Sequence, residues 1–292
     1  MKHPDTRNTI FSERAKLLRQ QSYPANQYLM RLHAPQTAAH AKPGSFIHIQ
    51  CGPDLLMRRP MSIMRANKKD GWIDILYKIH GEGTDRLAKH IEGDVLELLG
   101  PIGKPFKLEQ YKKLPLLIGG GVGIPPMVFL AEHMNKTYGL KPLVIMGSEV
   151  PFPFKTQPSQ IIINGIPDGA IATMPLLEDW GIPCRLTSTQ NFPGCFEGYV
   201  TDLAHQWLDS LEPGIINEVE IFSCGPIPML RAVGNLAKEY NLSCQISMEE
   251  YMACAVGGCA GCTIEIQADE GPAMKRVCVD GPVFEASAVF PT

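Results

Sequence analysis

The stretch Leu114-Pro-Leu-Leu-Ile-Gly-Gly-Gly-Val-Gly-Ile-Pro-Pro126 marks a change of architecture within the chain. Residues 114–118 predict a short buried strand, and the glycines that follow predict a tight turn. Pro125 and Pro126 favour the first turn of a helix, because an N–H group at that position has no partner inside the helix. Apolar residues then repeat on one helical face, at Met127, Leu130, Ala131 and Met134. The stretch therefore predicts a strand, turn and helix of a parallel α/β domain.

The same alternation of strand and helix continues after this stretch. Further strands are predicted at residues 143–146, 184–188 and 219–223, and further helices at residues 201–211 and 229–240. The strand at 219–223 leads through Cys224-Gly-Pro226 into the last of these helices. Residues 150–198 are otherwise rich in proline and glycine and give no clear assignment. We predict a parallel α/β domain at residues 111–245.

The chain before residue 111 consists of short extended segments separated by turn residues. They are Tyr28-Leu-Met-Arg-Leu-His33, Ser45-Phe-Ile-His-Ile-Gln50, Trp72-Ile-Asp-Ile-Leu-Tyr-Lys-Ile79 and Asp94-Val-Leu-Glu-Leu-Leu99. Strands at such short intervals indicate a small antiparallel β-barrel, which we predict for residues 1–110. One helix is predicted within it at residues 85–91, with Thr84 as the N-cap and Asp85 in the first turn.

Four cysteines near the end of the sequence have a spacing typical of a metal centre. They are Cys254, Cys259, Cys262 and Cys278. Their spacing, C-x4-C-x2-C-x15-C, is that of the ligands of a plant-type [2Fe–2S] cluster. Gly257, Gly258 and Gly261 allow loop conformations forbidden to other residues and bring backbone N–H groups close to the sulfides. A structural zinc site is the alternative, although such sites more often carry two matched C-x2-C pairs. We predict a small iron–sulfur domain at residues 246–292.

The composition excludes several classes of protein. Lys and Arg number 27 against 30 Asp and Glu, a net charge of −3 without a basic tract, so nucleic acid is not an expected partner. No apolar stretch approaches the roughly 18 residues needed to span a membrane. Residues 1–10 lack the apolar run of a signal peptide, and nine cysteines are an odd number for disulfide pairing. We therefore expect a cytoplasmic protein with reduced thiols.

Three other segments carry residue types suited to binding phosphate. In Arg59-Pro-Met-Ser62 a guanidinium can clamp a diphosphate, although a surface arginine beside a turn serine is the usual explanation for so short a motif. Gly83-Thr84 follows at an interval suited to a helix N-terminus, where free N–H groups favour phosphate. The turn Gly119-Gly-Gly-Val-Gly123 lets a pyrophosphate approach the backbone, although it departs from the G-x-G-x-x-G fingerprint.

Taken together, these motifs resemble the ferredoxin-NADP reductase superfamily over nearly the whole chain. Within it, Met248-Glu-Glu-Tyr-Met-Ala-Cys-Ala-Val-Gly-Gly-Cys-Ala-Gly-Cys262, followed by Val277-Cys-Val-Asp-Gly-Pro-Val-Phe284, looks like the electron-transfer subunit of class 1B dihydroorotate dehydrogenase. The resemblance implies an FAD-binding barrel, an NAD-binding α/β domain and a [2Fe–2S] domain. It further implies an NAD-linked oxidoreductase subunit in a hetero-oligomer, beside a separate FMN-containing subunit that oxidises dihydroorotate in pyrimidine biosynthesis.

The resemblance also implies a role for each motif. The residues that would contact FAD are Arg59, Pro60, Met61, Ser62, Leu76, Tyr77, Lys78, Gly83 and Thr84. The residues that would bound the NAD pocket are Gly120, Gly121, Val122, Gly123, Cys224, Gly225 and Pro226. Cys224 would lie near the nicotinamide as the catalytic candidate, the alternative being an ordinary buried thiol. Cys254, Cys259, Cys262 and Cys278 would ligate iron.

The implied electron path runs from dihydroorotate through the partner's FMN, this chain's cluster and FAD to NAD+. Glu149, after a predicted strand, favours NAD over NADP because it would repel a 2′-phosphate. Met61 departs from the family pattern, in which an aromatic residue often stacks on the flavin, and residues 150–198 match the family poorly. Two other functions stay open. They are a similar subunit of another oxidoreductase, of the NADH-dependent ferredoxin-NADP oxidoreductase or sulfhydrogenase type, and a non-catalytic regulatory protein.

Overall fold

A computed structural model describes residues 9–108 and 113–291, which divide into two compact units. The first unit comprises Met1–Pro105 with Met248–Val283, and the second comprises Phe106–Ser247 with Phe284–Thr292. The segment that carries the four cysteines therefore belongs to the unit that contains the N-terminal strands. The predicted boundary at residue 110 and residues 1–8, predicted to lack a signal peptide, lie outside the described residues. The three predicted domain ranges stay predictions.

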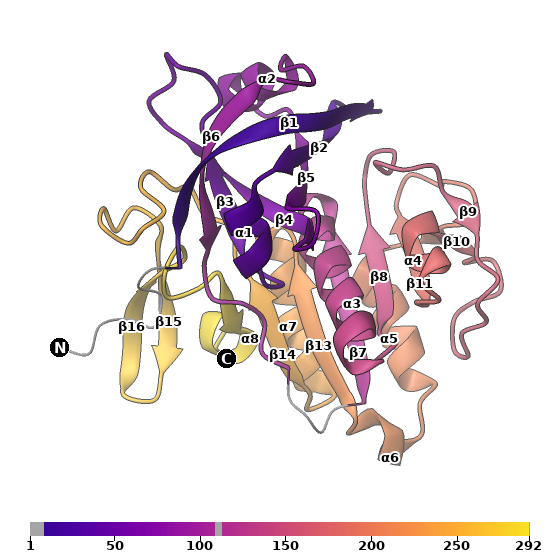
Figure 1. Cartoon of the computed structure of the whole chain (residues 1–292). Helices are drawn as coiled ribbons and strands as arrows, with labels where there is room; N and C mark the ends of the chain where they lie inside the picture. Colours follow the sequence, from indigo (N-terminus) through magenta and orange to yellow (C-terminus); the bar gives the residue numbers. More distant parts are fainter. Residues whose placement is uncertain (1–8, 109–112, 292) are drawn as a thin grey trace. The chain divides into compact units, whose positions relative to one another are not determined.

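Six strands of the first unit close an antiparallel barrel in the order β1-β2-β5-β4-β3-β6 (Figure 1). They are β1 (Phe11–Tyr23), β2 (Gln27–His33), β3 (Phe46–Ile49), β4 (Arg59–Asn67), β5 (Trp72–Lys78) and β6 (Val95–Ile102). Ile63 and Ile75 stand opposite each other on β4 and β5 and are fully buried, as inward-facing residues of a small barrel should be. The predicted barrel is confirmed. Strand β1 was not predicted, because only Ala15 and Leu17 in it are buried and the charged Arg14 and Lys16 alternate with them.

Two short helices accompany the barrel, α1 (Pro35–His40) and α2 (Glu82–Ala88). The predicted start of the second helix is wrong, because α2 begins at Glu82 and Gly81, with φ +78°, takes the N-cap position. Glycine adopts that backbone conformation without strain, so the chain turns into the helix earlier than Thr84 would allow. Thr84 instead lies in the first helical turn, where its hydroxyl accepts the N–H of His80 at 2.6 Å.

The cysteine-bearing part of the first unit contains little regular structure. Strands β15 (Thr263–Ala268) and β16 (Gly271–Arg276) form an antiparallel two-stranded sheet. Before it lies the cluster loop, residues 254–262, and after it the Cys278 turn, residues 276–281. The pairing of β15 with β16 sets Thr263 opposite Arg276, so the last residues of the cluster loop and the first residue of the Cys278 turn are neighbours.

The second unit is built on a sheet in the order β12-β11-β8-β7-β13-β14-β17, with parallel pairing from β12 to β14. The strands are β7 (Leu114–Gly120), β8 (Leu143–Gly147), β11 (Cys184–Ser188), β12 (Phe196–Glu197), β13 (Val219–Cys224), β14 (Ser243–Ser247) and β17 (Val283–Glu285). The chain builds outward from β7 to β12 and then returns to β13 on the other side of β7. The strand order therefore reverses between β7 and β13, and such a switch point forms a ligand crevice at the carboxyl ends of the strands.

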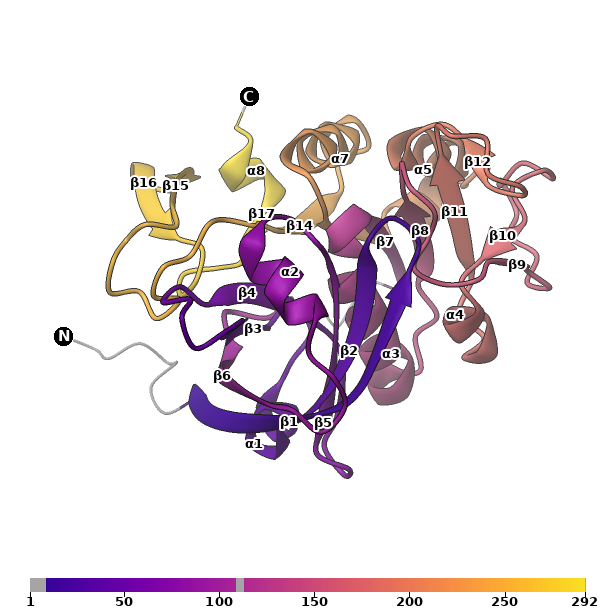
Figure 2. The ribbon, with the colours of Figure 1, turned by 90° about the horizontal axis from the view of Figure 1, so that it is seen from above.

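Helices cover both faces of this sheet. Helix α3 (Ile124–Tyr138) packs on one face, while α5 (Val200–Asp209) and α7 (Ile227–Glu239) pack on the other (Figure 2). The predicted apolar face of α3 is confirmed, since Met127, Leu130, Ala131 and Met134 are buried. The remaining elements are η1 (Gly121–Gly123), α4 (Pro175–Asp179), α6 (Pro213–Ile216), α8 (Ala286–Val289), β9 (Gln157–Pro158) and β10 (Ala172–Thr173). Among the described residues, none of the helices has the length and apolar character that crossing a membrane requires.

Candidate functional site

The four predicted iron ligands fall into two pairs. The thiols of Cys254 and Cys259 lie within hydrogen-bonding reach of each other, and so do those of Cys262 and Cys278. In each pair the backbone N–H of the second cysteine also donates to Sγ of the first, at 3.4 Å. Across residues 9–108 and 113–291, no three Cys, His, Asp or Glu side chains converge as they would around a single metal ion. Two pairs of thiols fit a binuclear cluster, with two thiolates for each iron.

Backbone N–H groups also bias the cluster loop toward thiolate. Burial acts to raise the pKa of Cys254, but hydrogen bonds from the backbone of Cys259, Val256 and Gly258 outweigh it and lower that pKa to about 7. The pKa of Cys278 is raised to about 12. Burial is the largest cause, and the hydrogen bond with Cys262 is the second. Iron binds the deprotonated form, so donors directed at sulfur are what a cluster site requires.

The cluster loop holds three residues in the left-handed region, Ala255 at φ +54°, Gly257 at +80° and Ala260 at +56°. The prediction that Gly258 and Gly261 supply special backbone conformations is wrong, because neither has a positive φ. An alanine in this region carries strain of roughly 1–2 kcal/mol, which persists where the surroundings fix the loop. After the turn at Ala260, the N–H of Gly261 donates to Sγ of Cys259 at 3.4 Å.

One charged side chain, that of Arg276, joins the two segments that carry the cysteines, and the sequence prediction missed it. Arg276 donates from its backbone N–H and from Nε to Oδ2 of Asp280, at 2.8 and 3.1 Å. Its Nη1 donates to the carbonyl oxygen of Gly257 in the cluster loop, at 2.9 Å. The signal available in the sequence was the symmetry of Arg276-Val-Cys-Val-Asp280 about Cys278, which places the two charges on either side of a ligand.

The structure brings together Arg59, Gly83 and Thr84 of the predicted FAD site. Arg59 opens β4, and its guanidinium lies so close to Gly83 that a Cβ on that glycine would stand 2.7 Å from Nε. Nη1 of Arg59 donates to the carbonyl oxygen of Met57 at 2.7 Å, which holds the charged group at the start of α2. A guanidinium beside a helix N-terminus suits a diphosphate, so these residues fit the group. Their role in binding it stays a prediction.

The other predicted flavin residues lie on two faces of β4 and β5. Met61 and Tyr77 are buried, whereas Pro60, Ser62 and Leu76 are half-buried and Lys78 is exposed. Alternation along a strand places Pro60 and Ser62 on the face opposite Met61. A flavin against the outside of this wall would therefore meet the half-buried residues first.

Tyr77 belongs to a network that sequence reasoning missed. It stands opposite Tyr28 on β2 with the rings stacked at 5.6 Å between centroids. Its hydroxyl donates to Oε1 of Gln20 at 3.2 Å, and burial raises its pKa. Nε2 of Gln20 in turn donates to the carbonyl oxygens of Ala88 and His90, each at 2.9 Å, so one side chain ties Tyr77 to the end of α2.

The predicted NAD residues meet at the switch point of the second unit. Cys224, the last residue of β13, stands in register with Gly119 near the end of β7. A Cβ on Gly123 would lie 2.0 Å from the carbonyl oxygen of Cys224, and one on Gly120 would lie 2.4 Å from Sδ of Met229. Glycine is therefore required for the two segments to approach this closely. Gly121, Val122, Gly225 and Pro226 complete the two turns.

Cys224 and Glu149 differ in accessibility at this edge of the sheet. The Cys224 side chain is fully buried, so its predicted place near a nicotinamide stays a prediction. Glu149 is exposed just beyond β8, whose final residue Gly147 stands opposite Gly120. In dinucleotide-binding folds, an acidic side chain beyond the C-terminal end of a strand accepts a hydrogen bond from a ribose hydroxyl, and Glu149 has such a position.

Comparisons of sequence place this arrangement among known proteins. Residues 249–290 match the family described as the iron–sulfur cluster binding domain of dihydroorotate dehydrogenase B. The chain is 34% identical over 249 residues to the electron transfer subunit of dihydroorotate dehydrogenase B (NAD+) of Caldanaerobacter subterraneus subsp. tengcongensis, covering 85% of this chain and 87% of the relative. It is 32% identical over 285 residues to the subunit of the same name from Bacillus caldolyticus, covering 96% and 99%.

Comparisons of structure confirm the fold class. A structure of NADH-dependent reduced ferredoxin-NADP oxidoreductase, studied for flavin-based electron bifurcation, matches with a TM-score of 0.75 at 22% identity, covering 95% of this chain and 90% of that chain. The ferredoxin reductase of carbazole 1,9a-dioxygenase matches with a TM-score of 0.61 at 20% identity, covering 80% and 67%. At these identities the likeness is one of fold, a barrel joined to an α/β domain.

Proposed function

The chain belongs to the family of electron transfer subunits of dihydroorotate dehydrogenase B, and from this membership we propose that it carries electrons between a partner's FMN and NAD+. It is an oxidoreductase subunit, and its cofactors are FAD, a [2Fe–2S] cluster and NAD. The finer proposal is that a separate FMN-containing catalytic subunit oxidises dihydroorotate and that this chain forms a hetero-oligomer with it, in pyrimidine biosynthesis. A cytoplasmic location stays a prediction.

The observation that carries the proposal is the arrangement of the four cysteines. Cys254 with Cys259 and Cys262 with Cys278 form separate pairs, and each pair has an N–H group directed at sulfur. When bound, FAD exchanges electron pairs with a nicotinamide and single electrons with an iron–sulfur centre. The chain's own contribution is to hold the thiolates, to direct donors at them and to keep the two kinds of cofactor on separate sets of strands.

The residues that hold the organic cofactors are proposed from their placement. Arg59 and the start of α2 at Gly83 and Thr84 bind the FAD diphosphate, because a cation and free N–H groups meet there. Pro60, Met61, Ser62, Leu76, Tyr77 and Lys78 form the strand wall that the flavin ring contacts.

NAD takes the switch point of the second unit. Its pyrophosphate lies on the turn Gly120, Gly121, Val122 and Gly123, and its nicotinamide lies toward Cys224, Gly225 and Pro226. Cys224 is proposed as the residue that contacts the reacting ring. Glu149 accepts a ribose hydroxyl and disfavours a 2′-phosphate, which supports NAD over NADP.

The partner docks on the face that exposes the cluster loop. Tyr251 is 87% exposed and Val256 is 49% exposed. The predicted iron ligand Cys259 is exposed as well. Large apolar side chains exposed beside a functional group mark an interaction surface. A partner that covers this face brings its FMN toward the thiolates and excludes water from them.

The test uses the chain co-purified with its FMN-containing catalytic subunit. We expect the anaerobic complex to show flavin and iron–sulfur absorbance and to reduce NAD+ when dihydroorotate is added. Cys259→Ser should keep its FAD but lose cluster absorbance and reduce NAD+ only at the background rate. Cys195→Ser, a half-buried cysteine outside the cluster loop, is the matched control and should behave as wild type. NAD+ reduction by the Cys259→Ser complex at the wild-type rate would sink the proposal.

A further inference from the structure

One guanidinium connects the two segments that supply the cluster ligands. Nη1 of Arg276 donates to the carbonyl oxygen of Gly257 in the cluster loop at 2.9 Å. Its Nε donates to Asp280 within the Cys278 turn at 3.1 Å. In the sequence, the strands β15 and β16 lie between the cluster loop and the Cys278 turn. The end of the loop already touches the turn, because Cys262 accepts the N–H of Val277 at its carbonyl oxygen, at 2.9 Å, and the N–H of Cys278 at Sγ, at 3.4 Å. The side chain of Arg276 adds a contact from the turn to the middle of the loop, between Cys254 and Cys259.

The Cys278 turn is itself organised by the backbone of the same residue. The carbonyl oxygen of Arg276 accepts the N–H groups of Val279, Asp280 and Gly281, at 3.2, 2.8 and 3.3 Å. The carboxylate of Asp280 closes the turn by accepting the N–H of Arg276 at 2.8 Å. Both ends of the turn are therefore fixed, and the guanidinium leaves it in a defined direction toward the cluster loop.

Gly257 is shaped to receive this contact. Its φ of +80° lies in the left-handed region that glycine adopts without strain. A Cβ at this position would stand 2.9 Å from Cγ2 of Val279 and 3.2 Å from Nη1 of Arg276. The carbonyl oxygen can reach the guanidinium because nothing larger than hydrogen occupies that space.

The guanidinium of Arg276 has one carboxylate partner among these contacts, since Nε lies 3.1 Å from Oδ2 of Asp280. The two side chains are 41% and 27% exposed, so the pair lies at the surface of the unit. The guanidinium is therefore a fixed cation in contact with both segments that carry the ligands.

We propose that Arg276 is a positioning residue of the iron–sulfur site, which holds the cluster loop against the Cys278 turn and sets a positive charge beside the ligands. This inference rests on the proposed function, since it presupposes a cluster at these cysteines. Holding the two segments together slows loss of iron. Reduction adds negative charge to the centre, so a fixed cation beside it favours the reduced form.

Three variants of the purified full chain test the proposal. Arg276→Gln removes the charge and the fork of donors, while Arg276→Lys keeps the charge and loses the planar fork. Lys275→Gln removes a positive charge from the neighbouring residue of β16, whose side chain points to the opposite face of the hairpin, and is the matched control. The readouts are the bleaching rate of cluster absorbance under an iron chelator and the cluster's midpoint potential from a titration followed by electron paramagnetic resonance.

We expect Arg276→Gln to bleach about tenfold faster than wild type, as for loss of a residue that orients metal ligands. Its ratio of reduced to oxidised cluster at a fixed ambient potential should fall about threefold or more, where a tenfold fall in that ratio corresponds to about 59 mV for one electron. Arg276→Lys should bleach faster while keeping a potential near that of wild type. Lys275→Gln should change neither quantity.

The opposing outcomes are equally definite. Wild-type bleaching and potential in Arg276→Gln, or equal shifts in Lys275→Gln, would overturn the proposal. If Arg276→Gln binds FAD but never assembles a cluster, the holding role is supported. If it does not fold, Arg276→Lys decides, and a wild-type bleaching rate in that variant overturns the proposal. A wild-type chain without iron–sulfur absorbance would instead refute the proposed function itself.

Discussion

The cluster loop of the first unit and the glycine turn of the second unit are both short, glycine-rich segments, but they depend on glycine in different ways. Gly123 faces the backbone of Cys224 so closely that a Cβ would stand 2.0 Å from a carbonyl oxygen. Gly258 in the cluster loop has no atom within 4 Å of the position that a Cβ would take. The glycine turn is fixed by close packing of backbones, and the cluster loop by side chains and hydrogen bonds to sulfur.

This difference shows what each segment has to provide. A dinucleotide is held by backbone atoms at a crevice between strands, so the turn must be bare and its neighbours must be close. Iron is held by side chains, so the cluster loop needs its three thiols in place beside Cys278 and tolerates open space at Gly258. Alanines at positions 255 and 260 adopt positive φ in the cluster loop, which shows that its conformation is imposed by the contacts of its side chains and N–H groups.

The strongest test of this comparison is Gly123→Ala. The added methyl group meets the carbonyl oxygen of Cys224 and cannot move away without separating β7 from β13. We expect the free energy of unfolding to fall by about 3 kcal/mol and NADH affinity to fall with it. Gly121→Ala is the matched control, since its φ is +54° but no atom lies within 4 Å, and it should lose only about 1 kcal/mol. Urea unfolding followed by tryptophan fluorescence measures the free energy of unfolding of both variants. Equal losses of stability in the two variants would contradict the packing argument.

A second prediction concerns a site that depends on one side chain. Arg59→Gln removes the charge that lies against Gly83 while leaving the backbone free of clashes. We expect FAD affinity to fall by about tenfold to a hundredfold, because a charge-assisted contact to the diphosphate is lost. Flavin fluorescence during titration of the deflavinated chain gives the affinity. Arg65→Gln, in the same strand, is the control, and an equal loss there would show a general effect of charge rather than a phosphate clamp.

Much of the fold and of the site was predictable because its signals are local. The spacing of Cys254, Cys259, Cys262 and Cys278 is by itself enough to indicate a metal centre. The apolar run that ends in glycines at residue 119 predicted a strand and turn, and the structure has β7 and η1 there. These patterns lie within a few residues of one another along the chain, so composition and period are enough to identify them.

The features that escaped prediction depend on partners distant in the sequence. The contact from Arg276 to Gly257 exists because β15 and β16 pair in one register, which no local pattern specifies. The start of α2 depends on the conformation of Gly81, which the residue types at Thr84 and Asp85 do not reveal. The stacking of Tyr77 on Tyr28 likewise follows from the closure of the barrel.

A smaller effect is expected within the cluster loop itself. Gly257→Ala places a methyl group against Val279 and the guanidinium of Arg276, at a φ that disfavours alanine, so the cluster should bleach severalfold faster under a chelator. Gly258→Ala, one residue on, meets open space and should change the bleaching rate less than twofold, as expected of a surface substitution. Equal behaviour of the two variants would show that the loop is not held through Gly257.

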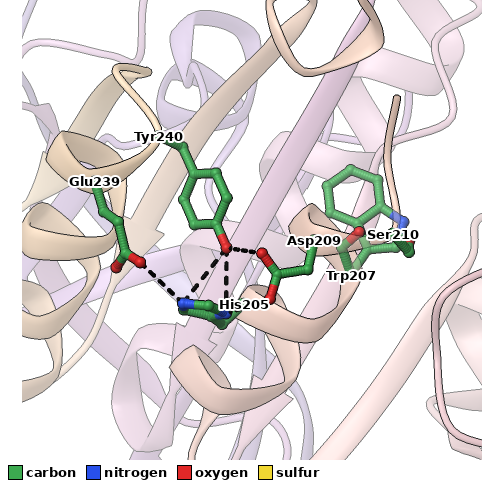
Figure 3. A network of polar contacts seen from close by, with 6 residues as sticks. All are labelled: His205, Trp207, Asp209, Ser210, Glu239 and Tyr240. Carbon is green, nitrogen blue, oxygen red and sulfur yellow. Dashed lines mark hydrogen bonds and ion pairs between the residues drawn. The ribbon is translucent and has the colours of Figure 1, made fainter. Parts of the chain in front are cut away.

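The second unit contains a polar network of a different kind from the one around Arg276. His205 on α5 contacts Oδ2 of Asp209 through Nδ1 at 3.0 Å and Oε1 of Glu239 through Nε2 at 3.1 Å (Figure 3). Tyr240 donates from its hydroxyl to Oδ1 of Asp209 at 2.5 Å. These residues tie the end of α5 to the end of α7, at the far end of α7 from Pro226. Unlike Arg276, the network touches no residue of a predicted cofactor site.

The smallest predicted effect is therefore one on stability alone, and it depends on pH. The hydrogen bond to Glu239 raises the pKa of His205, so its stabilising effect is complete below about pH 6.5 and is lost as the pH rises through the raised value. The bond from Tyr240 lowers the pKa of Asp209, so that contribution is lost in strong acid instead. We expect His205→Gln to lower the melting temperature by about 2 °C or less near pH 5.5, because exposed ion pairs contribute little, and by still less at pH 8. Calorimetry at the two pH values measures this, with His33→Gln, an exposed histidine of the first unit, as the control. A larger fall in melting temperature at pH 8 than at pH 5.5 would contradict a raised pKa of His205. An altered NADH affinity in His205→Gln would show that the network influences the nucleotide turn.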